Sequence, residues 1–177
     1  MIHTERLILR PIEPRDRDQL VAMLADPQVM RDLVRNPTRE TAQASIDRHI
    51  GYRDSHGLGF WTVEHDGAVA GLCGLKPGAA NTPIHGETEI GWLFNKPFWG
   101  KGLATEAALA SLAWAWANTA APRVVAITAA GHIKSQQVMA RLGMHRLPDG
   151  DFNHPMFAAE DAMRATVTFA IDRPETH

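Results

Sequence analysis

Glu89-Ile-Gly-Trp-Leu-Phe94 and its continuation, Asn95-Lys-Pro-Phe-Trp-Gly-Lys-Gly-Leu-Ala-Thr-Glu-Ala107, carry more information than any other part of this chain. The first segment is an apolar, strand-like run, and residues 103–118 favour a helix. Between them, Gly100 and Gly102 let the backbone approach a ligand closely. Free N–H groups in the first turn of a helix point at a bound anion. The stretch therefore predicts a strand, a glycine-containing turn and a helix start that together cradle an anion such as a pyrophosphate.

Length and composition are those of an ordinary globular protein. The 177 residues suffice for one domain with its own core, and we expect residues 1–177 to form it. Hydrophobic residues make up 45% of the chain and charged residues 21%, the balance expected of a chain that folds in water. The net charge of −2 argues against broad binding to nucleic acid, which requires clustered Lys and Arg.

The sequence also constrains the compartment. No apolar run reaches the roughly 18 residues that span a bilayer. The segment Met1-Ile-His-Thr-Glu-Arg6 has no apolar signal-peptide core. Cys73 is the only cysteine, so an internal disulfide is excluded, and its apolar neighbours favour a small buried residue over a nucleophile. We therefore expect a cytoplasmic protein with no membrane partner.

Hydrophobic periodicity and turn residues predict a mixture of strands and helices. His65-Asp-Gly67 separates two β-like runs, and Asp-Gly in that position is a strong hairpin signal. Thr38 is expected to cap a helix, and Asp26-Pro27 to end the helix before it. Strands are expected at residues 6–12, 59–64, 68–75, 87–94, 123–128 and 166–171, and helices at residues 16–25, 38–53, 103–118 and 134–142. Residues 157–165 are ambiguous. This order indicates an α/β protein with a hairpin-rich sheet.

Five motifs in order along the chain resemble those of the GNAT superfamily of acetyl-CoA-dependent N-acetyltransferases. The closer resemblance is to its RimJ/RimL-type branch, the ribosomal-protein N-terminal acetyltransferases and their relatives. The motifs are Thr4-Glu-Arg-Leu-Ile-Leu-Arg-Pro11, Asp26-Pro-Gln-Val-Met30, Gly57-Leu-Gly-Phe-Trp61, Glu89-Ile-Gly-Trp-Leu93 with Trp99-Gly-Lys-Gly-Leu-Ala-Thr-Glu-Ala107, and Ser135-Gln-Gln-Val-Met-Ala-Arg-Leu-Gly-Met144. The resemblance implies an α/β (α+β) GNAT fold. Its mixed, mostly antiparallel sheet would have about six or seven strands, splayed between the fourth and fifth, with about four flanking helices.

The same resemblance implies the donor and its binding residues. The donor would be acetyl-CoA, and the acetyl group would pass directly to a primary amine, on a protein N-terminus or a small molecule, in a ternary complex. The family signature Q/R-x-x-G-x-G/A falls on Trp99-Gly-Lys-Gly-Leu-Ala104, with Trp99 in place of Gln or Arg. The implied pyrophosphate-binding residues are Trp99, Gly100, Lys101, Gly102, Leu103, Ala104 and Thr105. The implied contacts to the pantetheine arm are Phe94 and Asn95, through their backbone, with His132 and Ser135.

The catalytic groups are less clearly indicated. The family's usual acid is a tyrosine, but the matching position here is Met139, which cannot donate a proton. Ser135 is the candidate to hydrogen-bond the departing sulfur, and helix capping is the alternative. The imidazole of His132 is a second candidate acid. Glu89 is the candidate base, acting directly or through a water, and a structural polar role is the alternative.

Other polar residues have simpler interpretations. Glu87 is expected to be a solvated strand end, and Glu106 to offset the helix start or to hold a neighbouring loop. His154 either contacts the substrate or is an ordinary loop histidine. No metal site is expected, because the nine histidines lack metal-ligand spacing.

Two alternatives and two open questions remain. A non-catalytic acyl-CoA-binding domain on the same fold would also explain the missing tyrosine. A nucleotide site is disfavoured because no G-x-x-x-x-G-K-[ST] motif is present. The acceptor is expected to lie against the first two helices and the loops at residues 76–86 and 149–159. The residues that would line that side are Arg31, Asp32, Arg35 and Tyr52. A homodimer is compatible with the sequence.

Overall fold

The β3–β4 hairpin lies in the middle of the sheet, and its turn has the predicted geometry. The structure, a computed structural model, describes residues 1–175. Strands β3 (Gly59–His65) and β4 (Ala68–Pro77) pair antiparallel on either side of Asp66 and Gly67. Both turn residues have positive φ, 51° and 76°, as a two-residue primed hairpin turn requires. The predicted hairpin is confirmed.

Within residues 1–175 the sheet has nine strands, against the six or seven expected. The long strands besides the hairpin are β2 (Leu7–Arg10), β5 (Thr88–Phe94), β6 (Arg123–Ala129) and β9 (Ala165–Asp172). The strands that the sequence does not reveal are β1 (Ile2–His3), β7 (His145–Arg146) and β8 (Phe152–Asn153). Two residues are too few to show an alternating pattern.

The sheet opens between β5 and β6. The strand order is β1-β2-β3-β4-β5-β6-β9-β7, with β8 also paired to β9, and only β5 and β6 run parallel. Their ladder contains two residue pairs, Thr88 opposite Val124 and Glu89 opposite Val125. Residues 90–94 and 126–129 continue past the last pair without bonding to each other, so the strands separate toward their C-terminal ends. The predicted splay between the fourth and fifth expected strands is confirmed.

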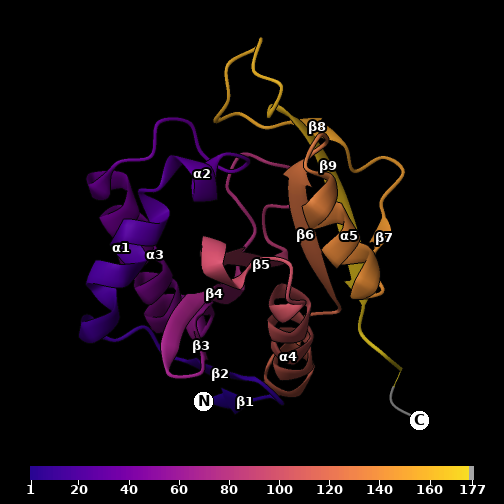
Figure 1. Cartoon of the computed structure of the whole chain (residues 1–177). Helices are drawn as coiled ribbons and strands as arrows, with labels where there is room; N and C mark the ends of the chain where they lie inside the picture. Colours follow the sequence, from indigo (N-terminus) through magenta and orange to yellow (C-terminus); the bar gives the residue numbers. More distant parts are fainter. Residues whose placement is uncertain (176–177) are drawn as a thin grey trace.

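Helices cover both faces of the sheet (Figure 1). On one face lie α1 (Arg17–Leu24), α2 (Pro27–Met30) and α3 (Arg39–His56), and on the other lie α4 (Leu103–Asn118) and α5 (Ile133–Arg141). Short 3-10 helices at Pro14–Asp16 and Lys96–Phe98 precede α1 and α4. The first face buries Leu20 and Ile46 against Leu72, and the second buries Leu103 and Met139 with Leu75, Ile90 and Cys73. Nowhere in residues 1–175 is a helix long and apolar enough to cross a membrane.

Helix α2 corrects the expectation that Asp26-Pro27 only ends a helix. Asp26 accepts a hydrogen bond from the N–H of Gln28 at 2.8 Å, and Pro27 occupies the first helical position, where no donor is needed. The same two residues therefore end α1 and begin α2. The predicted cap at Thr38 is confirmed, because its Oγ1 accepts from the N–H of Thr41 at 3.2 Å.

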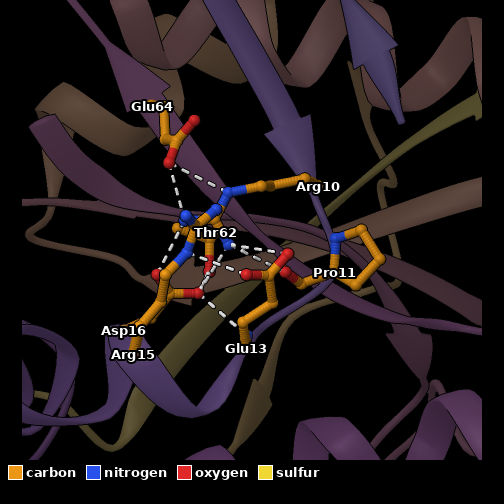
Figure 2. Close-up of polar contacts among 7 residues, drawn as sticks. All are labelled: Arg10, Pro11, Glu13, Arg15, Asp16, Thr62 and Glu64. Atoms are coloured by element: carbon orange, nitrogen blue, oxygen red, sulfur yellow. Dashed lines mark hydrogen bonds and ion pairs between the residues drawn. The ribbon is translucent and has the colours of Figure 1, made fainter. Parts of the chain in front are cut away.

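A buried ion pair fastens the start of α1 to the sheet (Figure 2). Nη1 and Nη2 of Arg10 donate to the two carboxylate oxygens of Asp16 at 2.7 Å each, and Nη2 also donates to Glu64 at 2.6 Å. Asp16 further accepts from Thr62 Oγ1 at 3.0 Å and from the N–H of Glu13 at 2.8 Å. Burial alone would raise the pKa of Asp16, but these hydrogen bonds outweigh it and lower that pKa. Asp16 is therefore an ionised, fully partnered buried carboxylate.

Candidate functional site

The turn between β5 and α4 leaves backbone donors available at the start of α4. Gly100 and Gly102 have positive φ of 74° and 76°, a conformation that favours glycine. Gly102 is the N-cap residue of α4, and no side chain caps this helix. Across the described residues, the N–H groups of Leu103, Ala104 and Thr105 therefore have no capping partner. The residue pattern and the backbone together form an anion-binding geometry.

Two side chains hold this turn in place. Trp99 donates its indole Nε1–H to the carbonyl of Phe94 at 2.6 Å, which ties the turn to the end of β5. Arg6 donates from Nη1 to the carbonyl of Lys101 at 2.9 Å. Trp99 occupies the position of the signature's Gln or Arg, and here it is 46% exposed.

Glu106 holds the segment before β2, one of the two roles expected for it. Its Oε1 accepts from Thr4 Oγ1 at 2.6 Å and from the N–H of Arg6 at 2.9 Å, and its Oε2 accepts from Arg6 Nε at 2.7 Å. Partial burial would raise the pKa of Glu106, but the bonds from Thr4 and Arg6 outweigh it and lower that pKa. All the hydrogen-bonding capacity of this carboxylate is directed at the N-terminal segment.

The open edge of β5 presents unpaired backbone groups. The N–H of Asn95 donates to Ala70 on β4 at 2.9 Å, so hydrogen-bonding alternation along the strand directs the backbone groups of Phe94 and Trp92 away from β4. Past Glu89 no β6 residue pairs with them. The carbonyl of Phe94 is occupied by Trp99, and the carbonyl of Asn95 accepts from Phe98 at 3.0 Å. The N–H of Phe94 and both groups of Trp92 are thus left facing the gap.

Glu89 lies at the point where β5 and β6 separate. It is 5% exposed and forms an ion pair with Lys76, directly opposite on β4. Burial raises the pKa of Glu89, and the charge of Lys76 opposes that rise. Glu87, expected to be a solvated strand end, lies just before β5 and is paired with Arg123.

Ser135 and Met139 lie one turn apart on the buried side of α5. Ser135 is 9% exposed and Met139 is 1% exposed, within the core shared with α4. The N-cap residue of α5 is His132, so Ser135 does not cap the helix. In the part of the chain that the structure describes, the Ser135 hydroxyl has no protein hydrogen bond. Met139, expected from the resemblance to stand in place of a tyrosine, is packed in the core and offers no proton.

His132 follows β6 and lies close to the segment that follows α2. Its Nδ1 lies 3.1 Å from Thr128 Oγ1, and its Nε2 lies 3.7 Å from a carboxylate oxygen of Asp32, which follows α2. Burial lowers the pKa of His132, and Asp32 opposes that change. The same segment after α2 is hydrogen-bonded to the loop after β8, because Nε and Nη2 of Arg35 each donate to Asp161 at 2.8 Å.

Three polar residues of this region escape sequence reasoning. Lys76, Arg6 and Asp161 all act through partners distant in sequence, and no local pattern marks them. Of the other expected residues, Tyr52 is edge-on to His49 at 6.0 Å between ring centroids. His154 accepts from the N–H of Met156 at 3.3 Å. Over residues 1–175, no three His, Cys, Asp or Glu side chains are grouped to hold a metal ion.

Comparison with known proteins gives a consistent result. Residues 6–145 match the family model described as "Acetyltransferase (GNAT) domain". The Bacillus subtilis protein YkkB is 32% identical over 153 residues, covering 80% of this chain and 83% of that protein. YnaD of Bacillus subtilis, described as an uncharacterized N-acetyltransferase, is 28% identical over 146 residues, covering 82% of each chain. The solved structure of RimL, described as a ribosomal L7/L12 α-N-protein acetyltransferase in complex with coenzyme A, superposes with a TM-score of 0.76 at 16% identity. That superposition covers 96% of this chain and 95% of RimL.

Proposed function

Because the chain belongs to the GNAT acetyltransferase family and is thus an N-acetyltransferase, we propose that it transfers the acetyl group of acetyl-CoA directly to a primary amine in a ternary complex. Two neighbouring features carry the proposal. The pairing between β5 and β6 ends at Glu89 and Val125, and the start of α4 has no side-chain cap. These two features lie consecutively along the chain, as a donor with a pyrophosphate and a long arm requires.

The donor-binding residues fit such a ligand. The N–H groups from Gly100 to Thr105 would receive the pyrophosphate, because free donors at a helix start favour an anion. The unpaired backbone edge of β5 would bind the amide groups of the pantetheine arm. Of the two residues expected there, Phe94 has a free N–H, whereas both backbone groups of Asn95 are bonded within the protein. Phe94 and Trp92 are therefore the contacts we assign.

The two candidate catalytic groups approach the gap from opposite faces. Glu89 shares its face with Lys76 and with α1 to α3, whereas Ser135 lies on α5, on the face of α4. The amine nitrogen forms a bond to the thioester carbonyl carbon, the carbon–sulfur bond breaks, and the thiolate takes up a proton. Glu89 would accept the ammonium proton, directly or through a water, and the Ser135 hydroxyl would hydrogen-bond the leaving sulfur. Much of the rate would come from holding amine and thioester together.

The acceptor is a primary amine on a peptide N-terminus or a small molecule. An α-amine, with a pKa of about 7.7–8.0, loses its proton far more easily than a lysine side chain with a pKa near 10.4. Glu89 is a carboxylate and, even with its pKa raised by burial, is a weaker base than a lysine amine. This consideration favours an α-amine or another weakly basic amine.

A binding experiment and a turnover experiment test the proposal together. At acetyl-CoA concentrations of about 100 times Kd, the protein should gain roughly 2.7 kcal/mol of stability. Free-thiol release, assayed over a panel of amines and N-terminal peptides, should depend on the added amine. Absence of any thermal stabilisation would defeat the proposal. Binding without turnover on any amine would instead favour a non-catalytic acyl-CoA-binding domain, the alternative that the buried Met139 supports.

A further inference from the structure

We propose that Arg6 is a positioning residue for the pyrophosphate-binding turn, and that it sets affinity for the donor without touching it. The inference rests on the proposed function, because it concerns the same turn. Arg6 lies before β2, far in sequence from residues 99–105. Its guanidinium nonetheless bridges two parts of that region, the carbonyl of Lys101 at 2.9 Å and the carboxylate of Glu106 at 2.6 Å.

The bond to Lys101 fixes the direction of the next donor. A trans peptide is planar, so the N–H of Gly102 points opposite to the carbonyl of Lys101. With that carbonyl held toward Arg6, the N–H of Gly102 points away from Arg6, toward the side where an anion would bind. This peptide joins Lys101 to Gly102, and Gly102, with a φ of 76°, has a wider conformational freedom than any other residue type. Loss of Arg6 would remove the side-chain hydrogen bond that holds this orientation.

Arg6 is itself held by a complete set of bonds. Its Nε and its backbone N–H both donate to Glu106, and Thr4 Oγ1 shares the same carboxylate. Thr4 in turn accepts from the N–H of Leu7 at 2.9 Å, which fixes the segment to β2. The sheet, the N-terminal segment, the first turn of α4 and Lys101 thus form one connected unit.

The ion pair between Arg6 and Glu106 allows two possible roles of Arg6 to be distinguished: positioning the turn and binding the phosphate directly. Glu106 neutralises Arg6, so the pair adds no net positive charge at the turn. If Arg6 bound phosphate directly, Glu106→Gln would free its charge and tighten donor binding. If Arg6 positions the turn, Glu106→Gln removes the support of the guanidinium and weakens binding. The two roles therefore predict opposite signs for one isosteric substitution.

The experiment compares acetyl-CoA with acetylpantetheine, a donor that has the thioester and the arm but no pyrophosphate. For Arg6→Ala and Glu106→Gln we expect the KM for acetyl-CoA to rise about tenfold, the scale of losing hydrogen bonds to a charged group. Their kcat should stay near the wild-type value, and their KM for acetylpantetheine should not change. The matched control is Arg17→Ala, which removes an equally exposed arginine paired to Asp47 at 2.6 Å on α1 and α3.

Each outcome is informative. Equal KM values for acetyl-CoA in Arg6→Ala and Arg17→Ala would overturn the inference. So would an equal rise in KM for acetyl-CoA and for acetylpantetheine, or a lower KM for acetyl-CoA in Glu106→Gln. If Arg6→Ala does not fold, Thr4→Val, which weakens the same unit, carries the comparison instead. Failure of the wild-type protein to use either donor would contradict the proposed function itself, a result that the wild-type measurements identify before any variant is compared.

Discussion

Lys76 on β4 and Glu89 on β5 form a buried ion pair, and Glu89 also belongs to the last residue pair that joins β5 to β6. The carboxylate is 5% exposed, and its partner lies directly opposite in the antiparallel ladder. A buried carboxylate without such a partner would tend to hold its proton at neutral pH. Lys76 thus favours the ionised form of Glu89, at the point where the gap between β5 and β6 begins.

Glu89→Gln should lower kcat for amine acetylation by about 100-fold, the lower end of what a positioned general base contributes. Lys76→Met should act differently: the pKa of Glu89 would rise further, so the acidic limb of the kcat/KM profile should move to higher pH. Thiol release measured across pH checks both. Glu87→Gln is the matched control, because Glu87 lies two residues before Glu89 and is also ion-paired. If Glu89→Gln keeps the wild-type kcat, Glu89 is not the base and has only a structural role.

Ser135→Ala should reduce kcat about tenfold or more, the scale of losing one hydrogen bond to a charged leaving group, while stability changes little. The reason is that its hydroxyl makes no protein hydrogen bond within residues 1–175, so the substitution leaves no partner unsatisfied. Single-turnover thiol release, combined with urea denaturation, checks both parts. Gln137→Ala, an exposed position on the same helix, serves as control. A loss of stability with no loss of rate would show that Ser135 matters for packing rather than for the leaving thiolate.

Asp16→Asn should destabilise the protein by about 3 kcal/mol at neutral pH, because it leaves Arg10 buried with only part of its counter-charge. The native pKa of Asp16 is lowered, so its contribution is complete above the unfolded pKa of about 3.9. It disappears as the pH falls through the native value. The difference between wild type and variant, measured by urea unfolding, should therefore shrink in acid. Asp18→Asn, an exposed change in the first turn of α1, should neither destabilise the protein to this extent nor show this pH dependence.

Local signals explain most of what the sequence predicts correctly. The β3–β4 turn, the cap at Thr38 and the turn at Gly100 and Gly102 each depend on residues within a few positions of one another. The separation of β5 from β6 is predicted by the family resemblance, because no residue pattern in either strand indicates it. What sequence reasoning misses is mostly long-range: Arg6 bonds to Glu106 100 positions away, and Lys76 to Glu89 across a strand pair. A charged residue on a strand looks the same whether it faces solvent or a buried partner.

The Arg35–Asp161 pair supports a final prediction about the acceptor side. It joins the connection after α2 to the connection between β8 and β9, 126 residues apart, and it holds the pKa of Asp161 at about 2. Because the pair stays ionised at any pH suitable for assay, its charge must be removed by mutation. Asp161→Asn should speed amide exchange over residues 154–164 and lower kcat/KM for the amine several-fold. The KM for acetyl-CoA should be unchanged, because the donor turn lies elsewhere.

Hydrogen-exchange mass spectrometry and initial rates at varied amine concentration measure these two effects. Arg35→Ala should reproduce them, and the double variant should show no further loss, since the two residues act through one contact. High salt should weaken the exposed pair and shift the wild-type protein toward the variants. Arg48→Ala, on α3 and outside this contact, is the control. Unchanged exchange over residues 154–164 in Asp161→Asn would show that the loop is held by its own packing, and that the ion pair has no part in placing the amine.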